Sequence, residues 1–224
     1  MAKISGEEIG RLIEEGSMHS CAKRSRSSCA KLIAAADLPS KFGNFQVFAF
    51  ETGDGKEHVA FTCGNVLNKE NVPVRIHSEC LTGDAIGSLR CDCGPQLQAS
   101  LRQIAKRRRG IVVYLRQEGR GIGLVNKIRA YRLQDSGLDT VEANKVLGFR
   151  PDERTYGIAA HMLNAFHVKS IKLISNNPSK FNELRKHGIR IIGRIPLTIK
   201  PNKYNIKYLK TKKSKLGQLL DNVA

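Results

Sequence analysis

The chain has 224 residues, which is long enough for one large or two small domains that bury a core without needing disulfides. Its 41% apolar and 26% charged residues are typical of a globular protein, and it lacks both a membrane-length apolar run and the apolar segment of a secretory signal. The formal net charge of +18 indicates an anionic partner: a nucleic acid, a nucleotide or a membrane surface. We expect a cytoplasmic protein without a membrane partner.

The N-terminal third of the chain shows a helical segment and then short strands. Glu7–Glu15 has helical character, and Ser20–Ala30 is a polar, basic stretch. We interpret that stretch as a linker, because it lacks the aromatic residues that stack on nucleic-acid bases. Phe45–Phe50 and His58–Cys63 flank the turn signal at residues 53–55 and predict a β-hairpin.

From residue 72 onward, strands and helices alternate. In chain order we expect the strand Val72–His77, the helix Pro95–Lys106, the strand Gly110–Leu115, the helix Gly123–Gln134, a helix from Asp152 or Glu153 to Phe166, the strand Ser170–Ile174, the helix Ser179–His187 and the strand Ile189–Ile195. The pattern predicts a mixed α/β (α+β) fold, a mixed sheet flanked by helices with a β-rich N-terminal part. We expect a lead segment over 1–37, a main domain over 38–198 and a basic tail over 199–224.

Three of the six cysteines, Cys80, Cys91 and Cys93, are close together in the sequence. Clustered cysteines in a reducing compartment favour metal binding or catalysis over disulfides. We favour a metal site over three unrelated thiols. Three thiolates and a water describe a catalytic zinc site, whereas His77 as a fourth ligand would close the site and remove hydrolytic chemistry. We interpret the remaining cysteines as ordinary thiols: Cys21, Cys29 and Cys63.

Three further segments carry polar residues where an anion could bind. The glycine-rich loop Gln117–Gly123 follows a strand and precedes a helix, but it fits neither the dinucleotide nor the Walker A pattern, so it is a phosphate loop or a plain turn. Ser179 is explained by a simple helix N-cap, although Lys180 just inside that helix hints at a bound anion. Asp152 caps a helix, or forms with Arg154 a charged pair that acts on a phosphate.

These segments belong to a larger set of motifs: RIHSECLTGD at 75–84, SLRCDCG at 88–94, RQEGRGIGL at 116–124, NKIRAY at 126–131, DTVEAN at 139–144, LGF at 147–149, DER at 152–154 and NNP at 176–178. In this order and spacing, the chain resembles GTP cyclohydrolase II, the first committed enzyme of riboflavin synthesis, from about Leu38 to about Leu197. The resemblance implies hydrolysis of GTP to 2,5-diamino-6-(5-phospho-ribosylamino)pyrimidin-4-one, formate and pyrophosphate. The resemblance also implies the fold of this family, a mixed sheet flanked by helices, and a homodimer.

The resemblance implies a role for each matching residue. Cys80, Cys91 and Cys93 would hold one Zn²⁺ per chain, and Mg²⁺ would accompany the GTP triphosphate. Asp152 would be the proton acceptor, Arg154 the nucleophile towards the α-phosphate, and Tyr131 a residue near the guanine. The GTP-binding residues would be Arg75, Ile76, His77, Ser78, Glu79, Gln96, Glu118, Gly119, Arg120, Thr140, Ser175 and Lys180.

Alternatives remain at the level of mechanism and function. A guanidinium has a pKa above about 12, so a covalent role for Arg154 requires strong deprotonation by Asp152; otherwise Arg154 is an electrostatic clamp. The net charge also fits a zinc-stabilised nucleic-acid-binding or regulatory module, although nucleic acid is not the expected partner. A third possibility is a GTP-opening variant that stops at the formylated pyrimidine.

Overall fold

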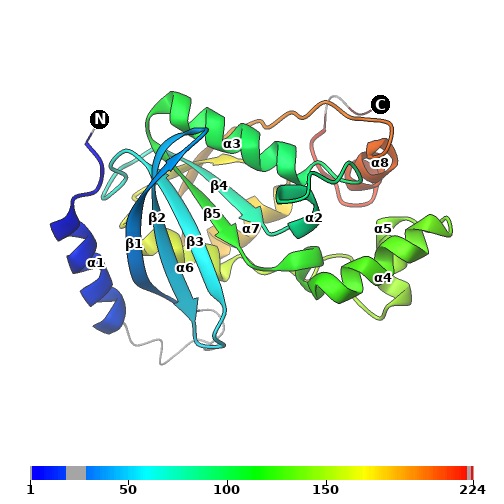
Figure 1. Cartoon of the computed structure of the whole chain (residues 1–224), viewed down its shortest axis with the longest axis horizontal. Helices are drawn as coiled ribbons and strands as arrows, with labels where there is room; N and C mark the ends of the chain where they lie inside the picture. The colour runs from blue at the N-terminus through cyan, green and yellow to red at the C-terminus, as the bar shows by residue number, and fades with distance from the viewer. Residues whose placement is uncertain (1, 19–28, 221–222, 224) are drawn as a thin grey trace.

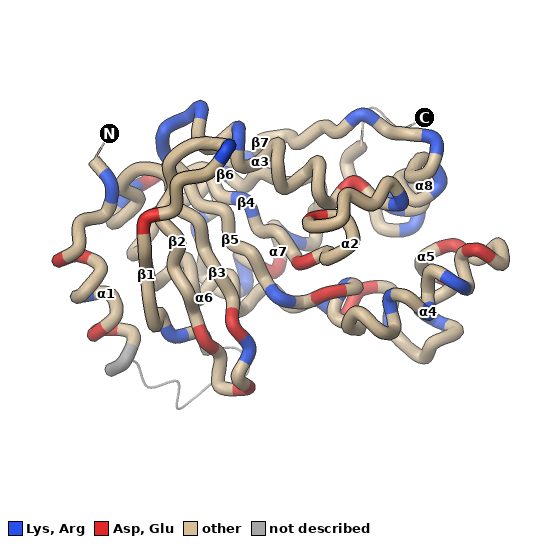
Figure 2. The backbone as a smooth tube through the Cα atoms, in the orientation of Figure 1, with Lys and Arg blue, Asp and Glu red and all other residues tan. Residues whose placement is uncertain are grey.

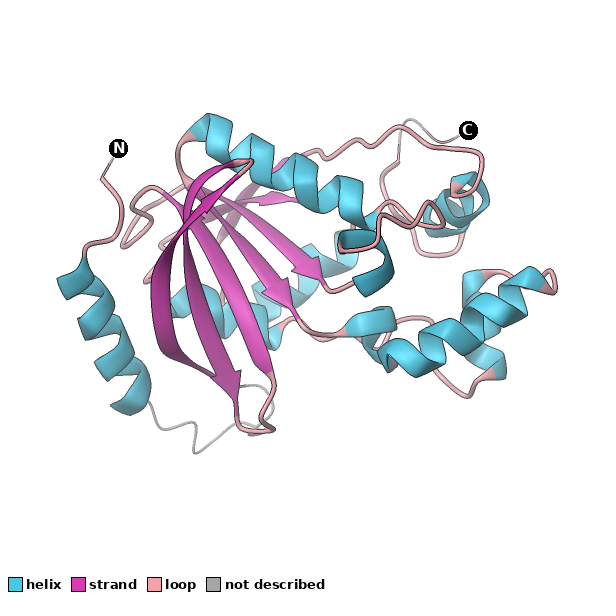
Figure 3. Ribbon diagram, viewed as in Figure 1, coloured by secondary structure: helices cyan, strands magenta, loops and turns pink. Residues whose placement is uncertain are grey.

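The computed structural model describes residues 2–18, 29–220 and 223. A seven-stranded sheet with the order β1-β2-β3-β5-β4-β6-β7 forms the centre (Figures 1 and 3). The pairs from β1 to β5 are antiparallel, and those from β5 to β7 are parallel. The strands are β1 Ala30–Ser40, β2 Gly43–Thr52, β3 Glu57–Cys63, β4 Val72–Ser78, β5 Gly110–Leu115, β6 Ile171–Ile174 and β7 Ile191–Ile195. The expected mixed sheet with a β-rich N-terminal part is confirmed.

Helices cover both faces of this sheet (Figure 3). The helices are α1 Gly6–Met18, α2 Leu81–Asp84, α3 Cys93–Arg107, the 3₁₀ helix η2 Glu118–Gly121, α4 Gly123–Asp135, α5 Thr140–Val146, α6 Gly157–Ala165, α7 Pro178–Lys186 and α8 Ile206–Ser214. Helix α3 packs on one face, whereas α6 and α7 pack on the other, and α1 lies against β1 (Figure 1). In the part of the chain that the structure describes, no helix is long and apolar enough to cross a bilayer.

The central strands are buried on both faces, which explains their nearly continuous apolar sequence. Along β5, Ile111 and Val113 enter the larger core beneath α6, while Val112 faces the smaller core beneath α3. This alternation follows from the two-residue period of a strand. Phe166, at the end of α6, packs edge-on against Phe48 with ring centroids 5.0 Å apart and so joins the helix layer to β2.

Most of the expected elements are present, but two expectations at helix starts are wrong. Helix α6 begins at Gly157, not at Asp152. The Asp152 carboxylate accepts a hydrogen bond from the Arg154 backbone N–H at 3.1 Å, and such a local side-chain bond competes with helix formation. Helix α7 is capped by Asn177, not by Ser179, because Pro178 is its first residue.

The N-terminal segment contains more structure than the sequence indicated. Strand β1 pairs with β2 from Ala30 to Ser40, so the expected boundary between 1–37 and 38–198 falls inside a strand; the division into three units stays a prediction. Most of the stretch interpreted as a linker, including Cys21, lies outside the described residues. Cys29 is disulfide-bonded and is therefore not the ordinary thiol we expected, whereas Cys63 is free.

Candidate active site

The candidate site lies where three neighbouring parallel strands end. His77 and Ser78 close β4, Glu118 follows β5, and Ser175 follows β6. The carboxyl ends of parallel strands meet at one edge of a sheet, and this edge is where open α/β sheets bind ligands. Helices α4 and α5 lie beyond the end of β5, away from the sheet, and α4 supplies Tyr131 to the site from that side (Figure 1).

Three thiols form a compact cluster at this edge. The sulfur atoms of Cys80, Cys91 and Cys93 lie within 4.8 Å of one another, and those of Cys80 and Cys91 are 3.7 Å apart. Tetrahedral zinc with Zn–S bonds of about 2.3 Å separates its sulfur ligands by about 3.8 Å. A Cβ at Gly83 would lie 2.9 Å from the Cys91 sulfur, so the glycine leaves the space that the cluster occupies. The donor set and its spacing therefore fit zinc.

Asp84 is the centre of a polar network beside the cluster. Its carboxylate lies 3.0 Å from His77 Nε2, accepts the Cys80 backbone N–H at 3.0 Å and accepts the Tyr114 hydroxyl at 2.9 Å. Burial lowers the pKa of His77 even though Asp84 opposes the shift, so the imidazole is neutral. Among the described residues, the metal-ligand cluster comprises only the three cysteines; His77 is paired with Asp84.

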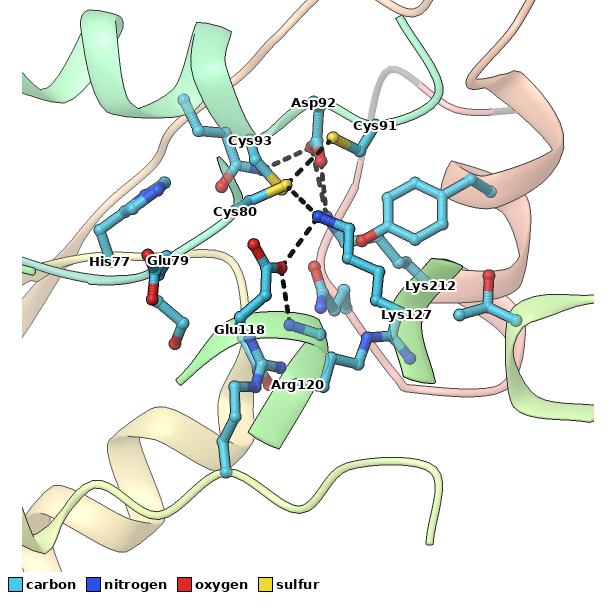
Figure 4. A pocket seen from close by; sticks show the side chains of 18 of the residues that line it. His77, Glu79, Cys80, Cys91, Asp92, Cys93, Glu118, Arg120, Lys127 and Lys212 are labelled. Carbon is cyan, nitrogen blue, oxygen red and sulfur yellow. Dashed lines mark hydrogen bonds and ion pairs between the residues drawn. The ribbon is translucent and has the colours of Figure 1, made fainter. Parts of the chain in front are cut away.

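A buried ammonium group lies between the thiols and the glycine-rich loop. Lys127 Nζ is 3.1 Å from the Cys80 sulfur and 2.9 Å from Glu118 Oε1 (Figure 4). Burial alone would lower the pKa of Lys127, but the Glu118 carboxylate and the Cys80 thiolate raise it above the ordinary value. Glu118 also accepts the Leu81 backbone N–H at 2.6 Å. Lys127 therefore stays charged and joins η2 and α4 to residues 80–93, the segment called here the cysteine loop.

Three cations line another part of the pocket, here called the basic wall: Arg75 and Lys180 are buried and Arg154 is partly buried. Arg75 donates to the Ile174 carbonyl at 3.1 Å, Lys180 donates to the Ile76 carbonyl at 2.7 Å, and Arg154 Nε donates to Asp152 at 2.8 Å. Burial lowers the pKa of Arg75 to about 10. Burial, followed by repulsion from Arg75 and Arg154, lowers the pKa of Lys180. Such a concentration of positive charge suits a polyanionic ligand.

The residues predicted from the sequence converge on one pocket. All of them line it except Ile76 and Asp152. Ile76 is fully buried in the core and reaches the site only through its carbonyl, and Asp152 lies behind Arg154 and holds its guanidinium. Tyr131, on α4, places its hydroxyl 3.3 Å from Thr82 Oγ1, and the Arg90 guanidinium lies 5.0 Å from its ring.

Several residues that line the pocket were not predicted from the sequence, among them Asp92, Lys127, Tyr208 and Lys212. Both Asp92 and Lys127 occur inside motifs that the sequence analysis used. The only sequence signal for Asp92 was its position between two cysteines of the cluster, and for Lys127 its position after the glycine-rich loop. Tyr208 and Lys212 belong to the lysine-rich C-terminal segment, which carries no local signal for a site. Their placement depends on the packing of α8.

The fold and the site define a class of protein: an α/β protein with a cluster of three thiols that could hold a metal ion, beside a basic pocket. The GTP cyclohydrolase II family model matches residues 31–196. The chain is 55% identical to GTP cyclohydrolase-2 of Tolumonas auensis over 86% of this chain and 98% of that protein. It is 53% identical to GTP cyclohydrolase-2 of Picrophilus torridus over 82% of this chain and 96% of that protein.

A second group of relatives is longer. The chain is 56% identical to the riboflavin biosynthesis protein RibBA of Bacillus subtilis over 82% of this chain and 46% of that protein. It spans about half the length of the RibBA relatives that it matches. Because the family match covers most of the sequence, the chain belongs to the GTP cyclohydrolase II family.

Proposed function

We propose that this chain hydrolyses GTP to 2,5-diamino-6-(5-phospho-ribosylamino)pyrimidin-4-one, formate and pyrophosphate, as the first step of riboflavin biosynthesis. The observation that carries the proposal is the position of the three-thiol cluster and the cations of the basic wall on one pocket. A phosphorylated purine has the two matching ends: a triphosphate for the cations and a ring whose hydrolysis needs an activated water.

The cluster is the proposed zinc site, with one Zn²⁺ held by Cys80, Cys91 and Cys93. When bound, zinc would act as a Lewis acid for the hydrolytic opening of the imidazole ring of guanine. Three protein ligands are typical of catalytic zinc, whereas structural sites take four. Lys127 keeps positive charge next to the Cys80 sulfur, and Tyr131 is proposed to contact the guanine near the ring that opens.

The basic wall is the proposed triphosphate site, with Mg²⁺ accompanying the phosphates. Burial lowers the pKa of Arg154, but the neighbouring Tyr156 and Asp152 raise it by more, so the pKa is raised overall and the guanidinium stays protonated. This charge state supports the clamp over the covalent nucleophile. Arg154 then offsets the negative charge of the departing pyrophosphate, and Asp152 holds its orientation through a two-point contact.

The C-terminal lysines bear on the alternative of a nucleic-acid-binding module. Lys212 pairs with Asp92, Lys215 pairs with Asp139 and Glu142, and Lys207 donates to a backbone carbonyl. Figure 2 shows Lys and Arg positions gathered around α8. Because several of the lysines contact groups of the same chain, the tail offers less charge to a nucleic acid than its sequence indicates. The enzyme remains the favoured function.

The proposal includes a homodimer. Three exposed apolar side chains on α4 support it: Leu124, Val125 and Ile128, the second of them 65% exposed. Clustered apolar side chains on a protruding helix are typical of an interface. Light scattering after gel filtration should give twice the chain mass, and Val125→Glu should shift the mass towards one chain; a monomeric wild type contradicts the dimer.

The activity is tested by incubating the purified chain with GTP and Mg²⁺ while measuring formate, pyrophosphate and bound zinc. Equal amounts of both products with about one zinc per chain are expected. Cys91→Ser should abolish formate release with the loss of zinc, while Cys63→Ser, which changes a free cysteine outside the site, should leave it unchanged.

Other outcomes separate the alternatives. Pyrophosphate without formate from the wild type means that the phosphate chemistry proceeds and the zinc step does not, unless the products include a formylated pyrimidine, which indicates the variant that stops there. Neither product, together with RNA binding that weakens steeply with salt, supports the nucleic-acid module. Formate release from zinc-free Cys91→Ser contradicts the zinc site.

A further inference from the structure

The segment from Asn202 to Leu220 follows the end of the family match at residue 196 and borders the candidate active site. It contains α8, and its residues Tyr208, Lys212 and Gln218 line the pocket. Lys212 is the residue of this segment that contacts the cysteine loop most directly. Its Nζ lies 3.0 Å and 3.2 Å from the two carboxylate oxygens of Asp92 (Figure 4).

This ion pair is buried. The side chains of Lys212 and Asp92 are 8% and 3% exposed. Removing one partner of a buried pair is costly, because the other charge remains without compensation. The pair therefore holds α8 and the cysteine loop together at this point.

Asp92 separates two of the proposed zinc ligands, and its backbone sets their relative direction. Its φ of −106° and ψ of 12° lie near the sparsely populated bridge region. As the N-cap of α3, an aspartate would ordinarily accept backbone N–H groups of its own helix. Asp92 makes no such cap bond; its carboxylate accepts Lys212 and the Gln96 side chain. The backbone between Cys91 and Cys93 is thus held in place by Lys212 of α8 through its ion pair with Asp92.

Further contacts hold α8 in this place independently of Asp92. Asn205 Nδ2 lies 3.4 Å from the Cys91 carbonyl, Lys215 Nζ lies 3.1 Å from Glu142 Oε1, and the Leu219 N–H donates to the Asn176 carbonyl at 2.9 Å. These contacts fix the helix that carries Lys212 relative to both the cysteine loop and α5.

We propose that Lys212 is a positioning residue for the metal centre: through Asp92 it orients the Cys91 and Cys93 thiolates. The inference rests on the proposed zinc site. Residues that orient metal ligands from outside the coordination sphere affect metal affinity by about 10- to 100-fold. We expect Lys212→Met to weaken zinc binding by a factor in this range, because methionine fills similar space without the charge.

The test measures zinc affinity by competition with a chromophoric chelator and the visible spectrum of the Co²⁺-substituted chain. The spectrum reports ligand geometry, which a loss of general stability would not change in the folded fraction. Lys212→Arg, which keeps the charge, should lose less affinity than Lys212→Met. Lys210→Met, an exposed lysine on the same helix, should match the wild type in both measurements.

Unchanged zinc affinity and an unchanged Co²⁺ spectrum in Lys212→Met overturn the inference. If Lys212→Met does not fold, Asp92→Asn removes the same ion pair with little change in shape, and wild-type affinity there overturns it equally. The double variant with both substitutions should bind zinc no more weakly than the weaker-binding single variant, since each substitution removes the same interaction. Failure of the wild type to release formate from GTP refutes the proposed function, whatever the lysine variants show.

Discussion

Gly83→Ala is a sharp test of the proposed zinc site, because it adds one methyl group beside the thiols. The new Cβ would lie 2.9 Å from the Cys91 sulfur, 3.1 Å from the Cys80 sulfur and 3.1 Å from Cys93 Cβ. Favourable nonbonded contacts lie at about 3.5–4.0 Å, so the cysteines must move by several tenths of an ångström. Overpacking of this kind costs about 1–3 kcal/mol.

That energy corresponds to zinc binding weakened by about 5- to 150-fold if the strain is released when the metal leaves. Helix α2 has ordinary helical backbone geometry at Gly83, so the substitution itself is compatible with the backbone. Zinc affinity would be measured by chelator competition, with urea unfolding followed with and without zinc. Gly10→Ala in α1, where a Cβ has no neighbour within 4 Å, is the matched control.

We expect Gly83→Ala to bind zinc more weakly than the wild type and Gly10→Ala to bind zinc with wild-type affinity. The zinc-dependent increase in the free energy of unfolding should shrink in parallel, because a ligand stabilises the folded state according to its affinity. Wild-type zinc affinity in folded Gly83→Ala would refute the assignment of the three sulfur atoms to one metal site.

Three other predictions concern the substrate pocket and the core. Arg154→Lys keeps the charge but loses the two-point contact with Asp152, so the KM for GTP should rise by roughly 10-fold while pyrophosphate release persists; unaltered GTP binding without any pyrophosphate release points to a covalent role instead. Tyr131→Phe should slow formate release by roughly 100-fold and pyrophosphate release by less, and equal losses contradict its place at the ring. Burial lowers the pKa of His58 to about 4 from 6.5, so the unfolded chain binds the extra proton first and stability falls as the pH drops through this window. Protonation of His58 should lower the free energy of unfolding by up to about 3 kcal/mol between pH 7 and 4. His58→Gln should remove this part of the pH dependence. The same pH dependence of urea unfolding in the wild type and in His58→Gln contradicts the prediction.

Local sequence pattern determined many of the elements and most of the candidate site. The apolar run Gly110–Leu115 coincides with β5, because a strand buried on both faces needs a continuous apolar sequence. The thiols, the glycine-rich loop and the polar residues after β4 and β6 were recognisable from residue types and spacing. Their convergence follows from parallel strands that end at a common edge.

Tertiary packing decided the rest. Asp152 has the sequence of a helix start, yet its carboxylate bonds to Arg154, and Glu153 N–H donates to the Arg120 carbonyl, so this segment is held against η2 and the helix begins later. The pairing of Lys212 with Asp92 joins residues that are 120 positions apart. A helical or strand period describes neighbours along the chain, whereas a buried ion pair depends on where distant elements dock. The sequence therefore predicts a solvated tail for the lysine-rich C-terminal segment. The segment lines the pocket only because α8 packs beside the cysteine loop.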